Sequence, residues 1–461
     1  MKVIQYFKSL LAVFGCITLY SCENLTEVGT PKTQLIGATV YKEESAATAA
    51  LLDVYARIRE NGVISGNLDG LTILMGLYAD ELTFFGNAAS PMDSFYNHAI
   101  IPSNESVLSL WANSYSQIYA ANAVWEGLSN STNITGEIRD RLQGEALFIR
   151  ALLHFHLVNL YGNIPYITTT DYQVNASVSR MPLTEVYERI IIDLKKAKEL
   201  LPANYLTQER VRVNKIAVQA LLARVYTYQE QWLLAELEAT DVINNTGLYN
   251  LESNLNNVFL KNNSSTIWQL HSGIAGVNTL EGRFLIFTSG PPPLFAINEN
   301  LMNAFETNDL RKQHWLKRIS EGSNIWYHSN KYKENVNTGV SKEYSIIFRL
   351  EEQYLIRAEA RAHQFNVTGA KQDLNTIRNR AGLDGTFAVT QQEVLLAIYQ
   401  ERRVEFFTEI GHRWFDLKRT GQASLELSPV KPAWHPRDVL MPLPEAEMIL
   451  NSNLQPQNFG Y

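Results

Sequence analysis

The chain has 461 residues, of which 46% are hydrophobic and 19% are charged, and its formal net charge is −7. This composition is typical of a globular protein and excludes an intrinsically disordered one. The sequence contains no block of basic residues, so it lacks the clustered cations that nucleic-acid-binding proteins use. We therefore expect a large folded body with no nucleic-acid partner.

The N-terminal segment has the pattern of a secretory signal. Lys2 and Lys8 precede an apolar run over residues 10–20, which is shorter than the roughly 20 residues that span a bilayer. The following LYSC sequence resembles a bacterial lipobox, so we predict that Cys22 is lipidated. A rival lipobox, VFGC, ends at Cys16, and an ordinary signal peptide with incidental cysteines is the remaining alternative.

These patterns predict a signal peptide over residues 1–21 and a polar tether and N-terminal arm over residues 22–44. No second long apolar segment follows, so we expect attachment to a membrane through the lipid alone. Both cysteines lie in this first part of the chain, which leaves the body without a disulfide or a thiolate metal site.

Helical periodicity dominates from Ser45 onward. The predicted helices span residues 46–60, 106–128, 137–162, 184–201, 214–228 and 231–245. In the second of them we expect a buried face made of Leu110, Trp111, Ile118, Tyr119 and Val124. Paired helices with Ala, Leu and Tyr at regular positions are typical of tetratricopeptide-type repeats, so we predict an array of helix pairs over residues 45–250.

The third predicted helix, at 137–162, is apolar around much of its second half, so we expect it to be buried. It carries His154 and His156, which point to different faces at this spacing and cannot hold one metal ion together. We expect one of these histidines to be packed and the other exposed.

Between about residues 251 and 345 the periodicity weakens and Gly, Pro, Asn and Ser accumulate. We predict a loop-rich insertion with short strands at 265–272 and 282–289 and one short helix near 301–307. Trp268 lies in an apolar alternation and is expected in the core. Helices return at 344–364, 370–382 and 390–409 and define a C-terminal helical part over residues 346–461.

The sequence VEFFTEIGHRWFDLKRTG, at 404–421, crowds an acid, a base and several cations between apolar residues. We interpret it as structural: Gly411 breaks a helix, a second short helix follows, and Trp414 and Phe415 anchor it in the core. The charged residues that we expect to join helix ends through hydrogen bonds are Arg413, Asp416 and Arg419.

Glutamates within residues 351–409 offer possible carboxylate pairs for glycoside hydrolysis, but arginines close in sequence are their expected partners. A glycine-rich phosphate loop, a GxSxG elbow and an HExxH motif are all absent. We therefore predict no catalytic residue and no cofactor. Acidic residues are sparse in the insertion, so we also predict no metal site there.

Several segments together resemble the SusD/RagB family of outer-membrane nutrient-binding lipoproteins. They occur in family order and include GEALFIRALLHFHLVNLYGNIPYIT, NKIAVQALLARVYTY, FRLEEQYLIRAEARAHQ, DLNTIRNRAGL, ERRVEFFTEIGHRWFDLKRTG and MPLPEAEMILNSNLQPQNFGY. The resemblance implies a mainly α fold in which tetratricopeptide-like helix pairs support a loop-rich ligand-binding region. These signature segments are architectural and carry no binding residue over to this chain.

The resemblance also implies a role without catalysis. Such a protein is lipid-anchored at the outer membrane, on the cell surface. It captures oligosaccharides and passes them to a SusC-like TonB-dependent barrel. In some members the ligand is a peptide instead, and that alternative stays open here. A general tetratricopeptide scaffold for protein assembly is a further alternative, but it would need neither the lipobox nor the C-terminal arm.

Sugar recognition uses aromatic rings against apolar ring faces and planar polar groups against hydroxyls. Two loop regions offer such residues, one around residues 80–99 and the other in the insertion. The candidates for ligand binding are Phe84, Phe85, Asn87, Phe95, Tyr96, Arg283, Trp326 and Tyr327. We single out Trp326 and Tyr327 because their sequence neighbours are polar.

Overall fold

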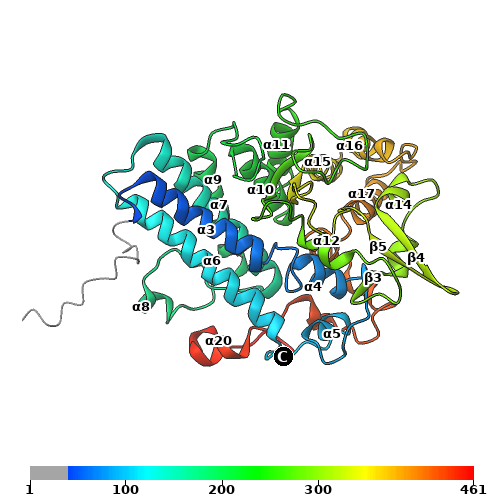
Figure 1. Cartoon of the computed structure of the whole chain (residues 1–461), viewed down its shortest axis with the longest axis horizontal. Coiled ribbons are helices and arrows are strands. Elements are labelled where there is room, and N and C mark those ends of the chain that lie inside the picture. The colour runs from blue at the N-terminus through cyan, green and yellow to red at the C-terminus, as the bar shows by residue number, and fades with distance from the viewer. Residues whose placement is uncertain (1–39) are drawn as a thin grey trace, which may run out of the picture.

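The structure is a computed structural model that describes residues 40–461 (Figure 1). The predicted signal peptide, Cys22 and nearly all of the tether lie outside these residues. Among the described residues, no helix is both long and apolar enough to cross a membrane.

Six long helices form the N-terminal half. They are α3 (Glu44–Asn61), α6 (Glu105–Ser129), α7 (Gly136–Tyr161), α9 (Leu183–Leu200), α10 (Lys215–Tyr228) and α11 (Trp232–Ile243). From α6 to α11 each of these helices packs against the next in chain order, and α3 covers α6 and α7. The array of helix pairs predicted for this part is confirmed.

Two details of these helices differ from prediction. The helix α9 begins at Leu183, one residue before the predicted start at 184, and Pro182 is its N-cap residue. Tyr119 was expected on the buried face of α6, but 49% of its surface is exposed. Periodicity placed it wrongly because the neighbouring elements leave that side of α6 partly open.

The helix α7 is the central helix of the N-terminal half. Every residue from Leu142 to Tyr161 is buried, which confirms the expectation from its apolar second half. It ends at Gly162, whose φ of +74° favours glycine. Both His154 and His156 are buried, so the expectation of one exposed histidine is wrong. Because this part of α7 is enclosed on all sides, neither histidine ring lies at the surface.

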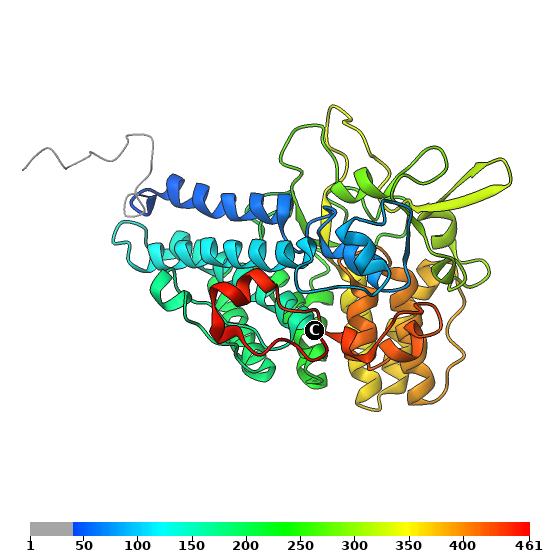
Figure 2. The same ribbon diagram turned by 90° about the horizontal axis from the view of Figure 1, so that it is seen from below.

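The helix pairs continue into the C-terminal half, where α11 packs against α15. The helices of this half are α15 (Leu350–His363), α16 (Val367–Arg380), α17 (Gln391–Glu405), α18 (His412–Arg419) and α19 (Ala423–Leu427). In Figure 2 these helices lie together, in yellow and orange, at one end of the molecule. The last helix, α20 (Glu445–Leu450), returns to the N-terminal half and lies beside α6.

Strands occur as three separate antiparallel pairs, β1 with β3, β2 with β6 and β4 with β5. Their bounds are β1 Leu82–Phe84, β2 Thr266–Leu270, β3 Phe295–Ile297, β4 Leu316–Glu321, β5 Asn324–Ser329 and β6 Ser345–Arg349. Short helical turns connect the rest: α4 Leu71–Tyr78, α5 Pro91–Tyr96, α8 Tyr172–Asn175, α12 Leu280–Leu285, α13 Glu299–Met302, α14 Leu310–His314, η1 Pro436–Val439 and η2 Ser452–Leu454.

The predicted strand at 265–272 is confirmed as β2, and Trp268 is fully buried in the core, as expected. The predicted strand at 282–289 is wrong, because the Thr279 side chain accepts from the Gly282 N–H and starts the helix α12 instead. The predicted helix at 344–364 is wrong over its first turn. Residues 345–349 form β6, where Ile346 and Ile347 add β-branched side chains to a strand paired with β2.

Candidate functional site

The strands β4 and β5 form a hairpin that projects from the body (Figure 1). Glu321 pairs with Asn324, so two residues make the turn, and the first of them is Gly322 with a φ of +58°. Trp326 and Tyr327 are adjacent on β5 and therefore point to opposite faces. One flat ligand cannot stack on both rings.

The two rings have different surroundings. Trp326 is partly exposed and lies against Gly290, where an added Cβ atom would come within 2.1 Å of its ring. A larger residue at position 290 would displace the indole from this place. Tyr327 packs instead against the hydrophobic core.

A second aromatic pair lies on the neighbouring strands. Phe84 on β1 is opposite Phe295 on β3, with their ring centroids 6.0 Å apart. The next residue, Phe85, donates its N–H to the Leu294 carbonyl at 2.7 Å and is 40% exposed. The strand β3 packs against both β1 and β5. We call the partly exposed group Phe84, Phe85, Leu294 and Trp326 the aromatic ridge.

The other predicted ligand-binding residues lie away from this ridge or are engaged. Phe95 is fully buried, with its ring edge-on to that of Tyr78, so its ring is closed to a ligand. Tyr96 is covered by Lys431, whose Nζ lies 4.0 Å from the ring centroid. The Asn87 side chain accepts from the N–H of Ala89.

Arg283 is exposed on α12, where its guanidinium lies 5.5 Å from the ring centroid of Phe284. Three further aromatic or basic residues of the insertion are buried: Phe287, Trp315 and Lys331. Lys331 donates to the carbonyls of Glu405 and Phe407 at 2.7 and 2.8 Å. Because they are buried, these three residues are closed to a ligand.

The stretch 404–421 is structural, as predicted. Gly411, with a φ of +70°, separates α17 from α18, and Trp414 and Phe415 are buried. Arg413 donates to Asp80 at 2.8 Å, and Asp416 accepts from Arg402 at 2.7 Å and Arg419 at 2.8 Å. The pairing of this stretch with Asp80 could not be read from the sequence, because the partner is 333 residues away from Arg413.

His412 is buried beside several cationic side chains. Burial lowers the pKa of its ring well below the ordinary value, and the positive charges of Arg224 and Arg402 lower it further. The ring stacks on Phe406 with a centroid distance of 4.7 Å. A neutral, stacked imidazole serves packing.

The glutamates considered for hydrolysis are buried, and none of them lines a cavity described below. Glu351, Glu352, Glu359, Glu405 and Glu409 are hydrogen-bonded to arginines, and Glu401 pairs with Arg311 and Arg378. Burial alone would raise the pKa of Glu405, but Arg380, Arg349 and Arg311 hold it well below its ordinary value. Carboxylates closed in ion pairs can neither reach nor protonate a glycosidic oxygen.

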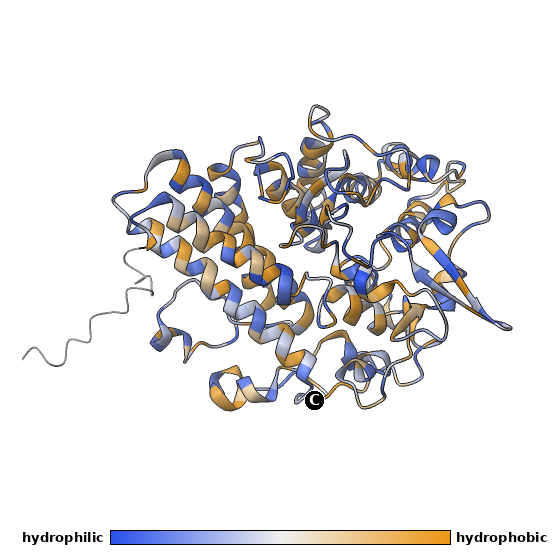
Figure 3. Cartoon of the chain, in the orientation of Figure 1, coloured by the Kyte–Doolittle hydropathy of each residue, from blue (hydrophilic) through white to orange (hydrophobic). Residues whose placement is uncertain are grey.

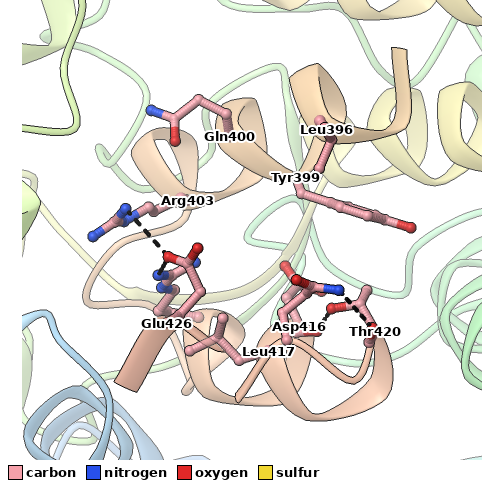
Figure 4. A pocket seen from close by; sticks show the side chains of 10 residues that line it. Leu396, Tyr399, Gln400, Arg403, Asp416, Leu417, Thr420 and Glu426 are labelled. Carbon is pink, nitrogen blue, oxygen red and sulfur yellow. Dashed lines mark hydrogen bonds and ion pairs between the residues drawn. The ribbon is translucent and has the colours of Figure 1, made fainter. Parts of the chain in front are cut away.

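We describe three of the cavities that open on the surface of residues 40–461, and the aromatic ridge lines none of these three. The first, of about 220 Å³, lies between α17, α18 and α19 (Figure 4). Its charged side chains are already paired, since Arg413 donates to Glu426 at 2.9 Å and Arg403 also binds Asp80. The other two, of about 550 and 500 Å³, lie along α6. Within residues 40–461 no group of three His, Cys, Asp or Glu side chains could hold a metal ion.

Comparisons with known proteins agree with this architecture. Residues 42–227 match a family described as "starch-binding associating with outer membrane", and residues 299–461 match the SusD family. The chain is 27% identical to the SusD-like protein P2 of Formosa agariphila, over 96% of this chain and 98% of that protein.

Solved structures share the fold, and two of them serve as examples. A SusD superfamily protein from Bacteroides vulgatus superposes with a TM-score of 0.81 at 20% identity, covering 92% of this chain and all of that one. A laminarin-binding SusD-like protein has a TM-score of 0.77 at 24% identity, covering 91% of this chain and all of that one. At such identities the likeness shows the fold alone.

Proposed function

Since this chain belongs to the SusD/RagB family, we propose that it is a cell-surface lipoprotein that captures oligosaccharide or polysaccharide. It delivers the glycan to a SusC-like TonB-dependent transporter in the outer membrane. The family description as starch-binding and the laminarin-binding structural neighbour support a carbohydrate ligand.

The aromatic ridge is the observation that carries this proposal. Its Phe85 is 40% exposed, and the partly exposed Trp326 lies against Gly290. Fixed aromatic faces bind the apolar faces of sugar rings with little loss of side-chain entropy. A binding role also agrees with the pairing of every candidate catalytic carboxylate.

The proposed anchor is Cys22, and residues 22–39 would connect it to the described body. Fully extended, this segment reaches at most about 60 Å, because each residue adds roughly 3.4 Å. An anchor within this reach would keep the body close to a transporter in the same membrane.

The first test is binding by the body, residues 23–461, to polysaccharides and to mixed peptides. We expect retardation in an affinity gel that contains one polysaccharide, and an affinity at least about tenfold weaker in a Trp326→Ala variant. Phe387→Ala is the matched control, because Phe387 is 90% exposed and lies outside the ridge. Saturable binding to peptides alone would overturn the glycan proposal and favour a peptide ligand.

A further inference from the structure

One side of α6 carries a row of five residues that line cavities. Every fourth residue from Trp111 to Gly127 lines a cavity, and such spacing keeps side chains on neighbouring turns. The row contains Trp111, Tyr115, Tyr119, Ala123 and Gly127. It extends for about 24 Å, at 1.5 Å per residue.

Two cavities follow this row and share Tyr119. One lies toward the C-terminal end of α6 and has a volume of about 550 Å³. The other lies toward its N-terminal end and has a volume of about 500 Å³. Because both cavities have Tyr119 in their lining, they adjoin each other, and we call the pair the α6 groove.

The part of the groove near the C-terminal end of α6 is polar. Tyr41 forms one wall and lies directly on the backbone of α6, where a Cβ atom at Gly127 would come within 2.1 Å of its ring. Glu126 accepts from the Thr170 N–H at 3.1 Å and from its hydroxyl, so its carboxylate is already engaged. The other polar lining residues are Lys42, Asn130, Ser131, Thr132 and Asn133.

The other part of the groove is more apolar. Trp111 and Tyr115 pack with ring centroids 4.8 Å apart, and the Tyr115 hydroxyl donates to the Pro165 carbonyl at 2.8 Å. The opposite wall comes from α20, where Leu450 is 80% exposed. Figure 3 shows the apolar colouring of α20 beside α6.

Two features of the groove point to a ligand with both apolar faces and hydroxyl groups. Tyr119, which lines both cavities, exposes 49% of its surface. Asn175 donates its amide to the Thr169 carbonyl at 2.8 Å, whereas its Oδ1 is enclosed and has no partner among the described residues. A rotation of the Asn175 side chain would bring this oxygen to the cavity that Asn175 lines, where a hydroxyl donor of a ligand would satisfy it.

We propose that the α6 groove is a second carbohydrate-binding site, which takes an extended glycan chain stacked on Tyr119. The inference rests on the proposed function and adds a site remote from the aromatic ridge. In Figure 1 the hairpin β4–β5 and the C-terminal end of α6 lie at opposite ends of the molecule. One long polysaccharide could engage both sites, which would raise its overall affinity through avidity.

The test uses affinity gels that contain laminarin, starch, xylan, mannan or pectin, followed by calorimetry with the polysaccharide that retards the unaltered protein most. Tyr119→Ala is expected to weaken that affinity about fivefold, and Tyr119→Phe, which keeps the ring, to preserve it. The melting temperature should not change, because Tyr119 is half exposed. Phe387→Ala is again the control.

Four proteins distinguish the possible outcomes: the unaltered chain and the variants Tyr119→Ala, Trp326→Ala and the double variant. Two sites are supported if the two single variants each lose affinity and the losses add up, so that the gel no longer retards the double variant. Unchanged affinity in Tyr119→Ala together with a loss in Trp326→Ala overturns the α6 groove and leaves the proposed function standing. No retardation of the unaltered chain in any gel overturns both.

Discussion

The two buried histidines of α7 differ in their hydrogen bonds, and burial shifts the pKa of both. His154 donates from Nδ1 to the Arg150 carbonyl at 2.8 Å and accepts at Nε2 from the Ile167 N–H at 3.1 Å. Both nitrogens of His156 are buried without a hydrogen-bond partner among the described residues. Burial lowers the pKa of each ring to about 3. Both rings are therefore neutral in the folded protein near pH 7.

Acidification should therefore destabilise the fold through these residues. Each folded pKa lies below the unfolded value of about 6.5, so the unfolded chain binds the proton first. The associated stability is present above pH 6.5 and is lost as the pH falls from about 6.5 to about 3. In that window each histidine contributes a slope of up to about 1.4 kcal/mol per pH unit.

We predict that His156→Phe removes the contribution of one titrating group from the slope of the free energy of unfolding against pH. The same variant should change the free energy of unfolding little at pH 7. His154→Phe should lower stability at pH 7 by about 1–3 kcal/mol, because it leaves the Ile167 N–H without an acceptor. Urea unfolding at pH 7, 6 and 5 measures both effects. If the free energy of unfolding has the same slope against pH in His156→Phe and in the unaltered chain, this prediction is wrong.

At the scale of elements, one carboxylate joins several chain segments. Glu405 is the last residue of α17 and accepts from Arg349 at the end of β6, from Arg380 at the end of α16 and from Arg311 in α14. All four side chains are almost fully buried. Removing one member of such a network leaves the others charged, desolvated and poorly paired.

Glu405→Gln keeps the shape of the side chain but removes its charge. We expect the free energy of unfolding to fall by about 3–5 kcal/mol. Glu199→Gln is the matched control, because Glu199 forms an exposed pair with Lys196 that should contribute at most about 1 kcal/mol. Midpoints of denaturant unfolding give both values, and similar losses in the two variants would refute a special role for the buried network.

At the scale of the whole molecule, buried ion pairs join the two halves. Arg224 on α10 donates twice to Glu352 on α15, with both distances 2.7 Å. Asp80, just after α4, binds both Arg403 and Arg413 in the C-terminal half. Since neither half satisfies these charges alone, we expect the described body to unfold as one cooperative unit.

Arg224→Met should lower the free energy of unfolding by about 3–5 kcal/mol, because it leaves the Glu352 carboxylate buried without a cation. The double variant Arg224→Met/Glu352→Met should recover most of that loss, since apolar side chains of similar size can replace a buried ion pair. Unfolding followed by tryptophan fluorescence and by circular dichroism should give one coincident transition. Two separate transitions in the unaltered chain would show that the halves are independent.

Local patterns in the sequence determined much of this fold. Hydrophobic residues at helical spacing predicted the long helices of both halves, and Gly162 and Gly411 marked helix boundaries, because these signals depend only on neighbouring residues. The structural role of residues 404–421 and the burial of Trp268 also followed from local patterns. The same signals could not distinguish a strand from a helix at residues 344–349, because pairing with β2 determines the conformation of this segment.

Only the tertiary structure decided which candidate ligand residues reach the surface. Phe85 and Phe95 lie in one predicted loop region, yet one is 40% exposed and the other fully buried. Trp326 and Tyr327 are adjacent in sequence but face opposite sides of β5. The α6 groove needs a wall from α20, more than 300 residues further along the chain. Exposure and cavity shape depend on contacts between distant segments, and a local pattern carries no information about its distant partner.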